Sequence, residues 1–262
     1  HGMEVAYYKK LFQTIGNIIE LIEKDDIPKY LLFLENAFPY MDNYNYHKGM
    51  NGIIQELTGL LKTKNIGTDS DRALLLDFQA TLETKPEKAI KLEKDALAQI
   101  ETITADNARL VSNLHANLGG LYRMNGHPDL AREHMEKSIS LLDQFNLLHI
   151  NDSIPQIANY AMFLTEQQEP ERGISELQKL SGIIKEYHSD DCLDYAKVQE
   201  TLGTIYLMTA NLPQAKTHFK RAFKIYEKIW ADEPEMIEAK YQEIQELYPQ
   251  IGFFIGKNLS GL

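Results

Sequence analysis

The sequence predicts an all-α protein, an α-solenoid built from antiparallel helix pairs. The first observation is a repeat: the pattern of residues 112–143 recurs 84 residues later, in residues 196–227. A shift of half that length, 42 residues, also aligns the chain with itself. The second is a series of small residues at intervals of 42, and the third is a series of prolines at nearly the same interval. The small residues are Ala89, Ala131, Gly173 and Ala215, and the prolines are Pro86, Pro128, Pro170 and, one residue later in its repeat, Pro213.

Each of four repeats is predicted to run helix, short turn, helix, with a longer connection to the next repeat. The repeats begin near Ser70, Ser112, Ile154 and Ala196. Proline is tolerated in the first turn of each second helix because its missing N–H would have no helical partner there. One pair cannot bury its apolar face alone, so neighbouring pairs must stack. A small rotation at each step then winds the array into a superhelix with an extended concave face.

Three helices are expected before the regular repeats. Apolar residues at spacings of three and four predict a helix over residues 4–23, and a second helix begins near Pro28. A third ends at about Lys62. Residues 1–66 are therefore interpreted as N-terminal helices that form either a degenerate repeat or a cap, and the sequence leaves both alternatives open.

The array itself is expected to occupy residues 67–233, with Asp69 or Ser70 capping its first helix. Residues 234–262 are expected to form a capping helix, from residue 234 to residue 248, followed by an apolar tail. A polar outer face on a terminal helix is what an array needs to remain soluble at its end.

Composition disfavours several classes of partner. The 262 residues carry a formal net charge of −11 at pH 7, which argues against nucleic acid, because binding phosphates requires clustered Lys and Arg. The same charge gives no reason to expect an anionic membrane surface. No apolar run approaches the length of about 18 residues needed for a membrane span. The only cysteine, Cys192, cannot form an internal disulfide, which favours a reducing compartment and predicts a cytoplasmic protein.

No motif points to catalysis, to a cofactor or to a metal. The sequence contains no HExxH, GxSxG, P-loop or dinucleotide-binding fingerprint. His134 and His218 share a repeat position that is expected to be exterior, and residues 190–194 lack the Gly and Glu spacing of an EF-hand. We therefore predict a protein that is not an enzyme and holds neither cofactor nor metal.

The residues that recur in the second and fourth repeats resemble the tetratricopeptide repeat pattern, with Leu-Gly and Tyr on the first helix and a small and a large residue on the second. A period of 42 is similar to the kinesin-light-chain type. The first repeat departs from the pattern with Asp77 for Gly and Glu93 for the aromatic, and the third with Ala161 and Gly173. The matching residues are Leu118, Gly119, Tyr122, Gly126, Ala131 and Met135, then Leu202, Gly203, Tyr206, Ala215, Phe219 and Ala222.

This resemblance implies a right-handed superhelix whose concave groove is lined by the first helices and binds an extended peptide. Asn117 and Asn159 would hold the peptide backbone, because an amide side chain both donates and accepts hydrogen bonds. A structural Asn bonded to a neighbouring helix is the alternative. The charged candidates would select the charge of the peptide, and Met162 would add an adaptable apolar contact. The full predicted set is Asn113, Asn117, Arg123, Asn159, Met162, Lys197 and Glu200.

The sequence thus predicts a non-catalytic protein- or peptide-binding scaffold that uses the concave groove of a tetratricopeptide-like array. The alternative is a peptide-sensing regulatory domain of a larger bacterial-type switch protein, in which an effector domain would respond to the bound peptide. Nothing in residues 1–66 resembles a helix-turn-helix reader, which weighs against the alternative without removing it. The oligomeric state stays open.

Overall fold

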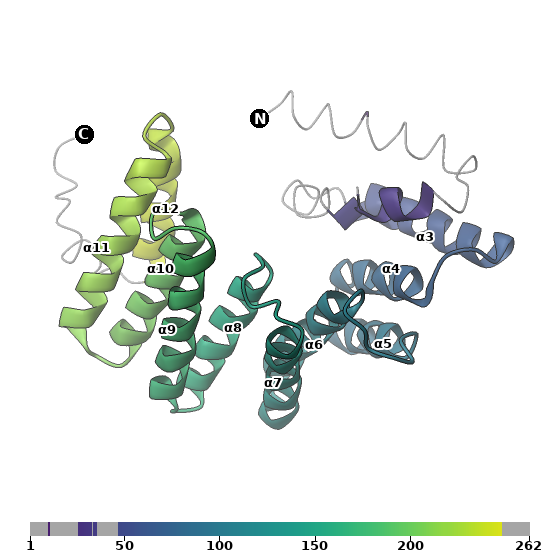
Figure 1. The fold of residues 1–262 in the computed structure, drawn as a ribbon, viewed down its shortest axis with the longest axis horizontal. Helices are drawn as coiled ribbons and strands as arrows, with labels where there is room; N and C mark the ends of the chain where they lie inside the picture. The colour runs from purple at the N-terminus through teal and green to yellow at the C-terminus, as the bar shows by residue number, and fades with distance from the viewer. Residues whose placement is uncertain (1–9, 11–25, 33, 36–46, 248–262) are drawn as a thin grey trace. The chain divides into compact units, whose positions relative to one another are not determined.

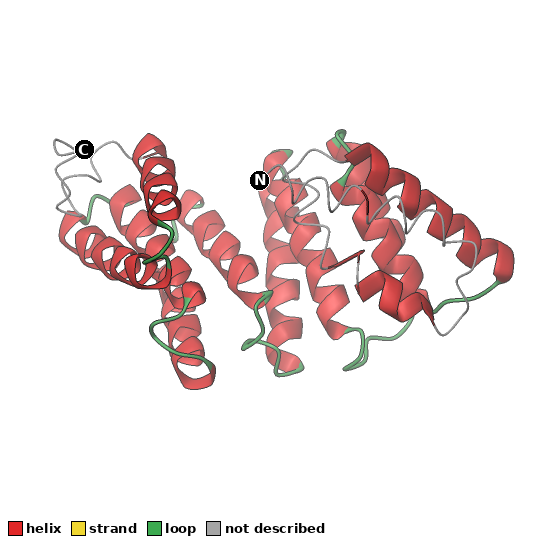
Figure 2. Ribbon diagram, turned by 90° about the horizontal axis from the view of Figure 1, so that it is seen from above, coloured by secondary structure: helices red, strands yellow, loops and turns green. Residues whose placement is uncertain are grey.

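The computed structural model describes residues 10, 26–32, 34–35 and 47–247, which form helices, turns and loops but no β-strand (Figures 1 and 2). The all-α prediction is confirmed. Of the predicted helix over residues 4–23 only Lys10 is described, and it is helical; the apolar tail after residue 248 lies outside the described residues. The second expected helix is present in part, because residues 27–32 and 34–35 are helical.

Within each repeat a turn of three or four residues joins the two helices, and a longer connection leads to the next repeat, as predicted (Figure 1). The first helix of each predicted repeat is called an A helix (α4, α6, α8 and α10), and the second a B helix (α5, α7, α9 and α11). A further helix, α12, begins at Pro234 as predicted and follows the array. In chain order the helices are α3 (His47–Lys64), α4 (Asp69–Thr81), α5 (Pro86–Leu97), α6 (Ala108–Met124), α7 (Pro128–Gln144), α8 (Ser153–Glu166), α9 (Pro170–Tyr187), α10 (Leu193–Met208), α11 (Leu212–Ile229) and α12 (Pro234–Leu247).

The chain forms two compact units, residues 1–134 and 135–262, with the boundary inside α7. Each unit has its own apolar core. In unit 1, α3 and α4 bury side chains together with the helical residues before α3, among them Leu34, Ile54, Leu57, Leu75 and Phe78. In unit 2 the core runs from the end of α7 to α12, with Leu180, Tyr195, Leu202, Phe219 and Tyr226 among its members.

The small residues at the regular repeat interval are buried, as predicted. Ala89, Ala131 and Ala215 are at most 1% exposed, and Gly173 is also buried. The approach is very close in the third repeat, where a Cβ atom added to Gly173 would lie 2.6 Å from the carbonyl oxygen of Ala161 on α8. A methyl group does not fit at that distance, so the absence of a side chain is what lets α8 and α9 pack together.

The N-terminus of α4 is capped by Thr68, and not by Asp69 or Ser70 as predicted. Thr68 is the N-cap: its Oγ1 accepts a hydrogen bond from the Asp71 N–H at 3.1 Å, and Asp71 Oδ2 accepts one from the Thr68 N–H at 2.6 Å. This reciprocal arrangement is a capping box. The prediction of Asp69 or Ser70 as the cap is therefore wrong. Both residues lie in the first turn, where the negative charge of Asp69 is favourable near the positive end of the helix dipole.

The first repeat contains a pair of carboxyl groups where the other repeats have apolar or small residues. Glu93 on α5 is only 1% exposed, and it is hydrogen-bonded to Asp77 on α4, which is partly exposed. Burial, reinforced by the charge of Asp77, raises the pKa of Glu93 to about 10. Burial also raises the pKa of Asp77 to about 6. At neutral pH, Glu93 is thus protonated and donates to the Asp77 carboxylate, while Glu93 Oε2 has no hydrogen-bond partner.

Two glycines of α9 provide a matched test of the close helix contact. We expect Gly173→Ala to lower the thermal midpoint, because the added methyl must push α9 away from Ala161, and overpacking costs about 1–3 kcal/mol. Gly182→Ala, on the same helix but with nothing near its added Cβ, should raise the midpoint, since alanine favours a helix by about 1 kcal/mol over glycine. The close contact is refuted if Gly173→Ala is as stable as Gly182→Ala in thermal unfolding followed by circular dichroism.

Glu93→Gln should reduce the dependence of stability on pH. Between its ordinary pKa of 4.5 and the folded value of about 10, Glu93 keeps a proton in the folded state that it releases when unfolded. The folded state then binds more protons, so stability falls as the pH rises through this range. Glutamine keeps a donor for Asp77 but does not titrate, so we expect the variant to exceed the parent in thermal midpoint at high pH and to approach it at low pH.

The matched control is Asp95→Asn, which neutralises an exposed carboxylate on the same helix. The thermal midpoint of this control, measured from acid to alkaline pH, should depend on pH in the same way as that of the parent. A Glu93→Gln variant with the pH profile of the parent would show that Glu93 is ionised in the folded protein.

Candidate functional site

The seven residues predicted to bind a peptide all lie on A helices. Because the helices belong to two units, the residues form two sets. Unit 1 contributes three residues of α6, and unit 2 contributes two residues of α8 and two of α10. These are Asn113, Asn117 and Arg123, then Asn159 and Met162, and finally Lys197 and Glu200.

In unit 1, Asn117 is exposed but bonded within the protein. Its Nδ2 donates to Oδ1 of Asp77 at 2.7 Å, which joins α6 to α4. This hydrogen bond favours the ionised form of Asp77 and opposes the effect of burial on its pKa. The acceptor is peculiar to the first repeat, because Asp77 occupies the position at which the next repeat has Gly119. Asn117 is therefore bonded to a neighbouring A helix, which is the structural role given above as the alternative to peptide binding.

The other two candidates of unit 1 are half-buried, and each interacts with neighbouring groups. Asn113 lies near the middle of α6, and Arg123 lies in its last turn. A cation in the last turn is favourable beside the negative end of the helix dipole.

In unit 2, Asn159 is exposed and makes no hydrogen bond through its side chain to any described residue. It occupies the position of Asn117 in the following repeat, but the counterpart of Asp77 there is Gly119, which has no side chain to accept a bond. Met162 is half-buried and packs against the core of unit 2. The amide of Asn159 is thus available to a ligand beside a partly covered apolar side chain.

The two candidates of α10 differ sharply in their surroundings. Lys197 is exposed and lies 3.7 Å from Asp194, one turn earlier. Glu200 is only 19% exposed: it accepts a hydrogen bond from the Tyr226 hydroxyl at 2.6 Å and pairs with Lys240 Nζ at 3.0 Å. Glu200 therefore joins α10 to α11 and α12, the two helices that follow it in the chain.

The electrostatics of this cluster follow from its burial. Burial alone lowers the pKa of Lys240, but the carboxylates of Glu200 and Glu243 outweigh it, so the net effect raises that pKa. Burial and the Glu200 charge together raise the pKa of Tyr226. The lysine stays charged and the phenol neutral, which leaves the Glu200 carboxylate satisfied from two sides.

The histidines at the shared B-helix position are half-buried, and the expectation that they are exterior is wrong. His134 Nδ1 lies 2.9 Å from Nδ1 of His115 on α6, and His218 Nδ1 lies 2.9 Å from Oε1 of Gln199 on α10. Burial lowers the pKa of both residues. The rings also stack on tyrosines of the A helices, His134 on Tyr122 and His218 on Tyr206, with centroids 5.4 and 5.3 Å apart.

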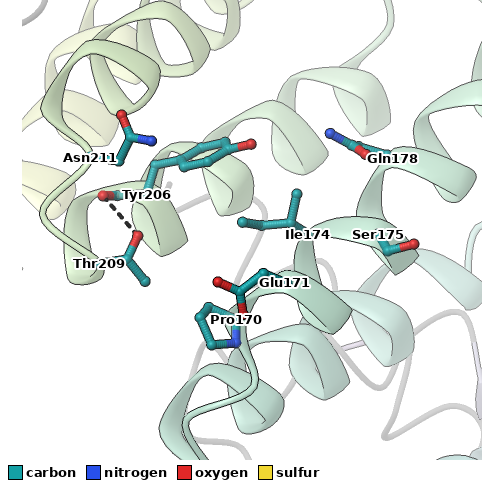
Figure 3. A pocket seen from close by; sticks show the side chains of 8 residues that line it. All are labelled: Pro170, Glu171, Ile174, Ser175, Gln178, Tyr206, Thr209 and Asn211. Carbon is teal, nitrogen blue, oxygen red and sulfur yellow. Dashed lines mark hydrogen bonds between the residues drawn. The ribbon is translucent and has the colours of Figure 1, made fainter.

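Unit 2 also contains a pocket of about 430 Å³ that the sequence analysis missed (Figure 3). It lies between the first half of α9 and the end of α10. The hydroxyl of Tyr206 is directed towards Gln178, and Thr209 Oγ1 donates to the carbonyl oxygen of Tyr206 at 3.2 Å. None of the seven predicted residues lines the pocket. The repeat pattern predicts that Tyr206 packs between helices, and it does not indicate that the ring also lines a pocket.

Two further observations concern the described residues alone. Within them, no group of three or more His, Cys, Asp or Glu residues is arranged to hold a metal ion. No helix of the described part combines the length and the apolar character needed to cross a bilayer.

Comparison with known sequences identifies part of the chain. Residues 153–228, which include the helix pairs α8–α9 and α10–α11, match the family model of the tetratricopeptide repeat. No curated protein sequence matches the chain significantly.

Several solved structures share the fold at low sequence identity. A putative kinesin light chain from Podosopora anserina, with nearly identical tetratricopeptide-like repeats, has a variant structure that matches with a TM-score of 0.62 and 13% identity, over 80% of this chain and 99% of that one. A second structure of that protein gives 0.58 and 14%, over 74% and 93%. The BtubC (BKLC) structure from P. vanneervenii gives 0.52 and 18%, over 77% and 74%. Residues 153–228 of this chain therefore match the tetratricopeptide repeat, and the solved structures share its helical-repeat fold over 74–80% of the chain.

Proposed function

We propose that the chain is a protein-binding scaffold whose unit 2 binds an extended peptide along the A helices α8 and α10. Tetratricopeptide repeats are generally protein-interaction scaffolds, which supports the first part of the proposal. The observation that carries the second part is the exposed side chain of Asn159, which has no hydrogen-bond partner among the described residues.

The two A helices can act as one surface because α8 and α10 pack against each other. On it, Asn159 would exchange hydrogen bonds with a peptide N–H and C=O, independently of the peptide's side chains. Met162, half-buried beside it, would contact an apolar side chain. Lys197 is exposed, and its only ion pair in the described part is with the half-buried Asp194 at 3.7 Å; it would favour a peptide carboxylate.

The remaining candidates support peptide binding less well. Glu200 already accepts from Tyr226 and pairs with Lys240, so a ligand would have to replace both contacts. Asn117 would have to leave Asp77. Removing one donor from a half-buried carboxylate costs about 1–3 kcal/mol, which would be subtracted from any gain in binding.

Asn159→Ala should weaken peptide binding without changing stability. Peptides selected from a random library on the intact chain would serve as probes, and their affinities for parent and variant would be measured by fluorescence anisotropy. We expect a loss of about tenfold, because one or two backbone hydrogen bonds of about 1 kcal/mol each are removed. If every selected peptide binds the variant as tightly as the parent, the proposed surface on α8 is wrong.

Asn117→Ala should show the opposite behaviour, lower stability with little loss of binding. Removing the amide deprives Asp77 of a donor, which costs about 1–3 kcal/mol. Urea unfolding of the two Asn→Ala variants, which change equivalent positions of successive A helices, makes each the control for the other. Equal midpoints for the parent and Asn117→Ala would mean that the hydrogen bond to Asp77 contributes nothing to the stability of unit 1.

A further inference from the structure

The solvent face of α11 carries a row of lysines. Lys216, Lys220, Lys224 and Lys228 follow one another at intervals of four residues, and all are exposed. One such interval advances about 6 Å along a helix axis and turns by about 40° beyond a full turn, so the positive charges form an evenly spaced, slanted row across the solvent face of α11. The apolar side of the same helix is buried in the core of unit 2.

No other B helix has this charge distribution. The sequence of α11 contains five basic residues and one acidic residue, Glu227. The helices α5 and α9 each contain three of either sign, and α7 contains two basic and four acidic residues. In a chain with a net charge of −11, the basic face of α11 is therefore a local feature.

The row is only partly neutralised within the protein. Lys228 forms an ion pair with Asp191, and this contact, together with the nearby charge of Lys224, lowers the pKa of Asp191. Among the described residues, Lys216, Lys220 and Lys224 form no ion pair. Like charges four residues apart destabilise a helix, so packing of the array does not explain the row.

The surroundings of the row favour an acidic protein segment over the other polyanions. The apolar face of α11, with Phe219, Phe223 and Tyr226 at most 1% exposed, is unavailable for insertion into a membrane. A nucleic acid requires many phosphate contacts, and the negative charge of the rest of the chain would repel it. A helix with carboxylates at the same interval of four residues can place one carboxylate beside each lysine of the row.

We propose that Lys216, Lys220 and Lys224 dock an acidic helical segment of a partner protein in which Glu or Asp recurs every four residues. This surface lies on a B helix. It is therefore distinct from the A-helix surface proposed above, and either could exist without the other.

A binding experiment with the intact chain tests this surface. The probe is a fluorescent alanine-based helical peptide with Glu at every fourth position, and its partner peptide has Gln at the same positions. The parent should bind the Glu peptide, more weakly as salt is added, and should not bind the Gln peptide. The triple variant Lys216→Gln, Lys220→Gln, Lys224→Gln should bind the Glu peptide at least about tenfold more weakly, since each exposed charge pair contributes up to about 1 kcal/mol.

The matched control removes the same charge elsewhere. Lys85, Lys88 and Lys91 are exposed at the start of α5, and their triple replacement by Gln should leave affinity within about twofold of the parent. Equal losses in the two triple variants would mean that only the overall charge matters, which overturns the proposal. It is also overturned if the Glu peptide fails to bind the parent, or if duplex DNA or phosphatidylserine vesicles bind the row more tightly than the peptide does.

Discussion

The close contact between A and B helices is the constraint on which the rest of the structure depends. Around Gly173 the backbone of α8 lies where a methyl group would have to be, and Ala89, Ala131 and Ala215 hold the same position in the other repeats. Small residues at this position bring each helix pair together, and the larger residues on either side then have neighbours to pack against. The small residues recur at a constant spacing because each repeat has the same steric requirement at this position.

The first repeat keeps this small residue, Ala89, but departs from the pattern at two other positions. Asp77 and Glu93 replace a small and an aromatic residue, and they remain compatible with burial because Glu93 keeps its proton and donates to Asp77. Burying one charge shared by two carboxyl groups is less unfavourable than burying two. The same carboxylate then accepts from Asn117, so a departure from the repeat pattern in α4 and α5 determines what a side chain of α6 can do.

The helices could be predicted from the sequence because the periodic pattern repeats, whereas the environment of each candidate residue could not. Asn117 and Asn159 occupy equivalent positions, yet one has an acceptor and the other does not, because a single residue on the preceding A helix is Asp in one case and Gly in the other. The neighbours of Glu200 lie on the next two helices of the chain, beyond any local pattern. His134 and His218 were misplaced because the repeat pattern does not show that a half-buried imidazole can stack on a tyrosine of the A helix.

The attachment of α12 has a consequence for how the end of the array responds to ionic strength. This helix buries Tyr241 and Ile244 in the core of unit 2, and among the described residues Lys240 links it to Glu200 of α10, each side chain being 19% exposed. Salt screens exposed charges strongly and half-buried pairs much less, so this link persists under conditions in which a surface contact such as Lys179 to Asp143 is screened. At high ionic strength α12 therefore keeps its ion pair to α10, whereas the exposed ion pairs of unit 2 are weakened.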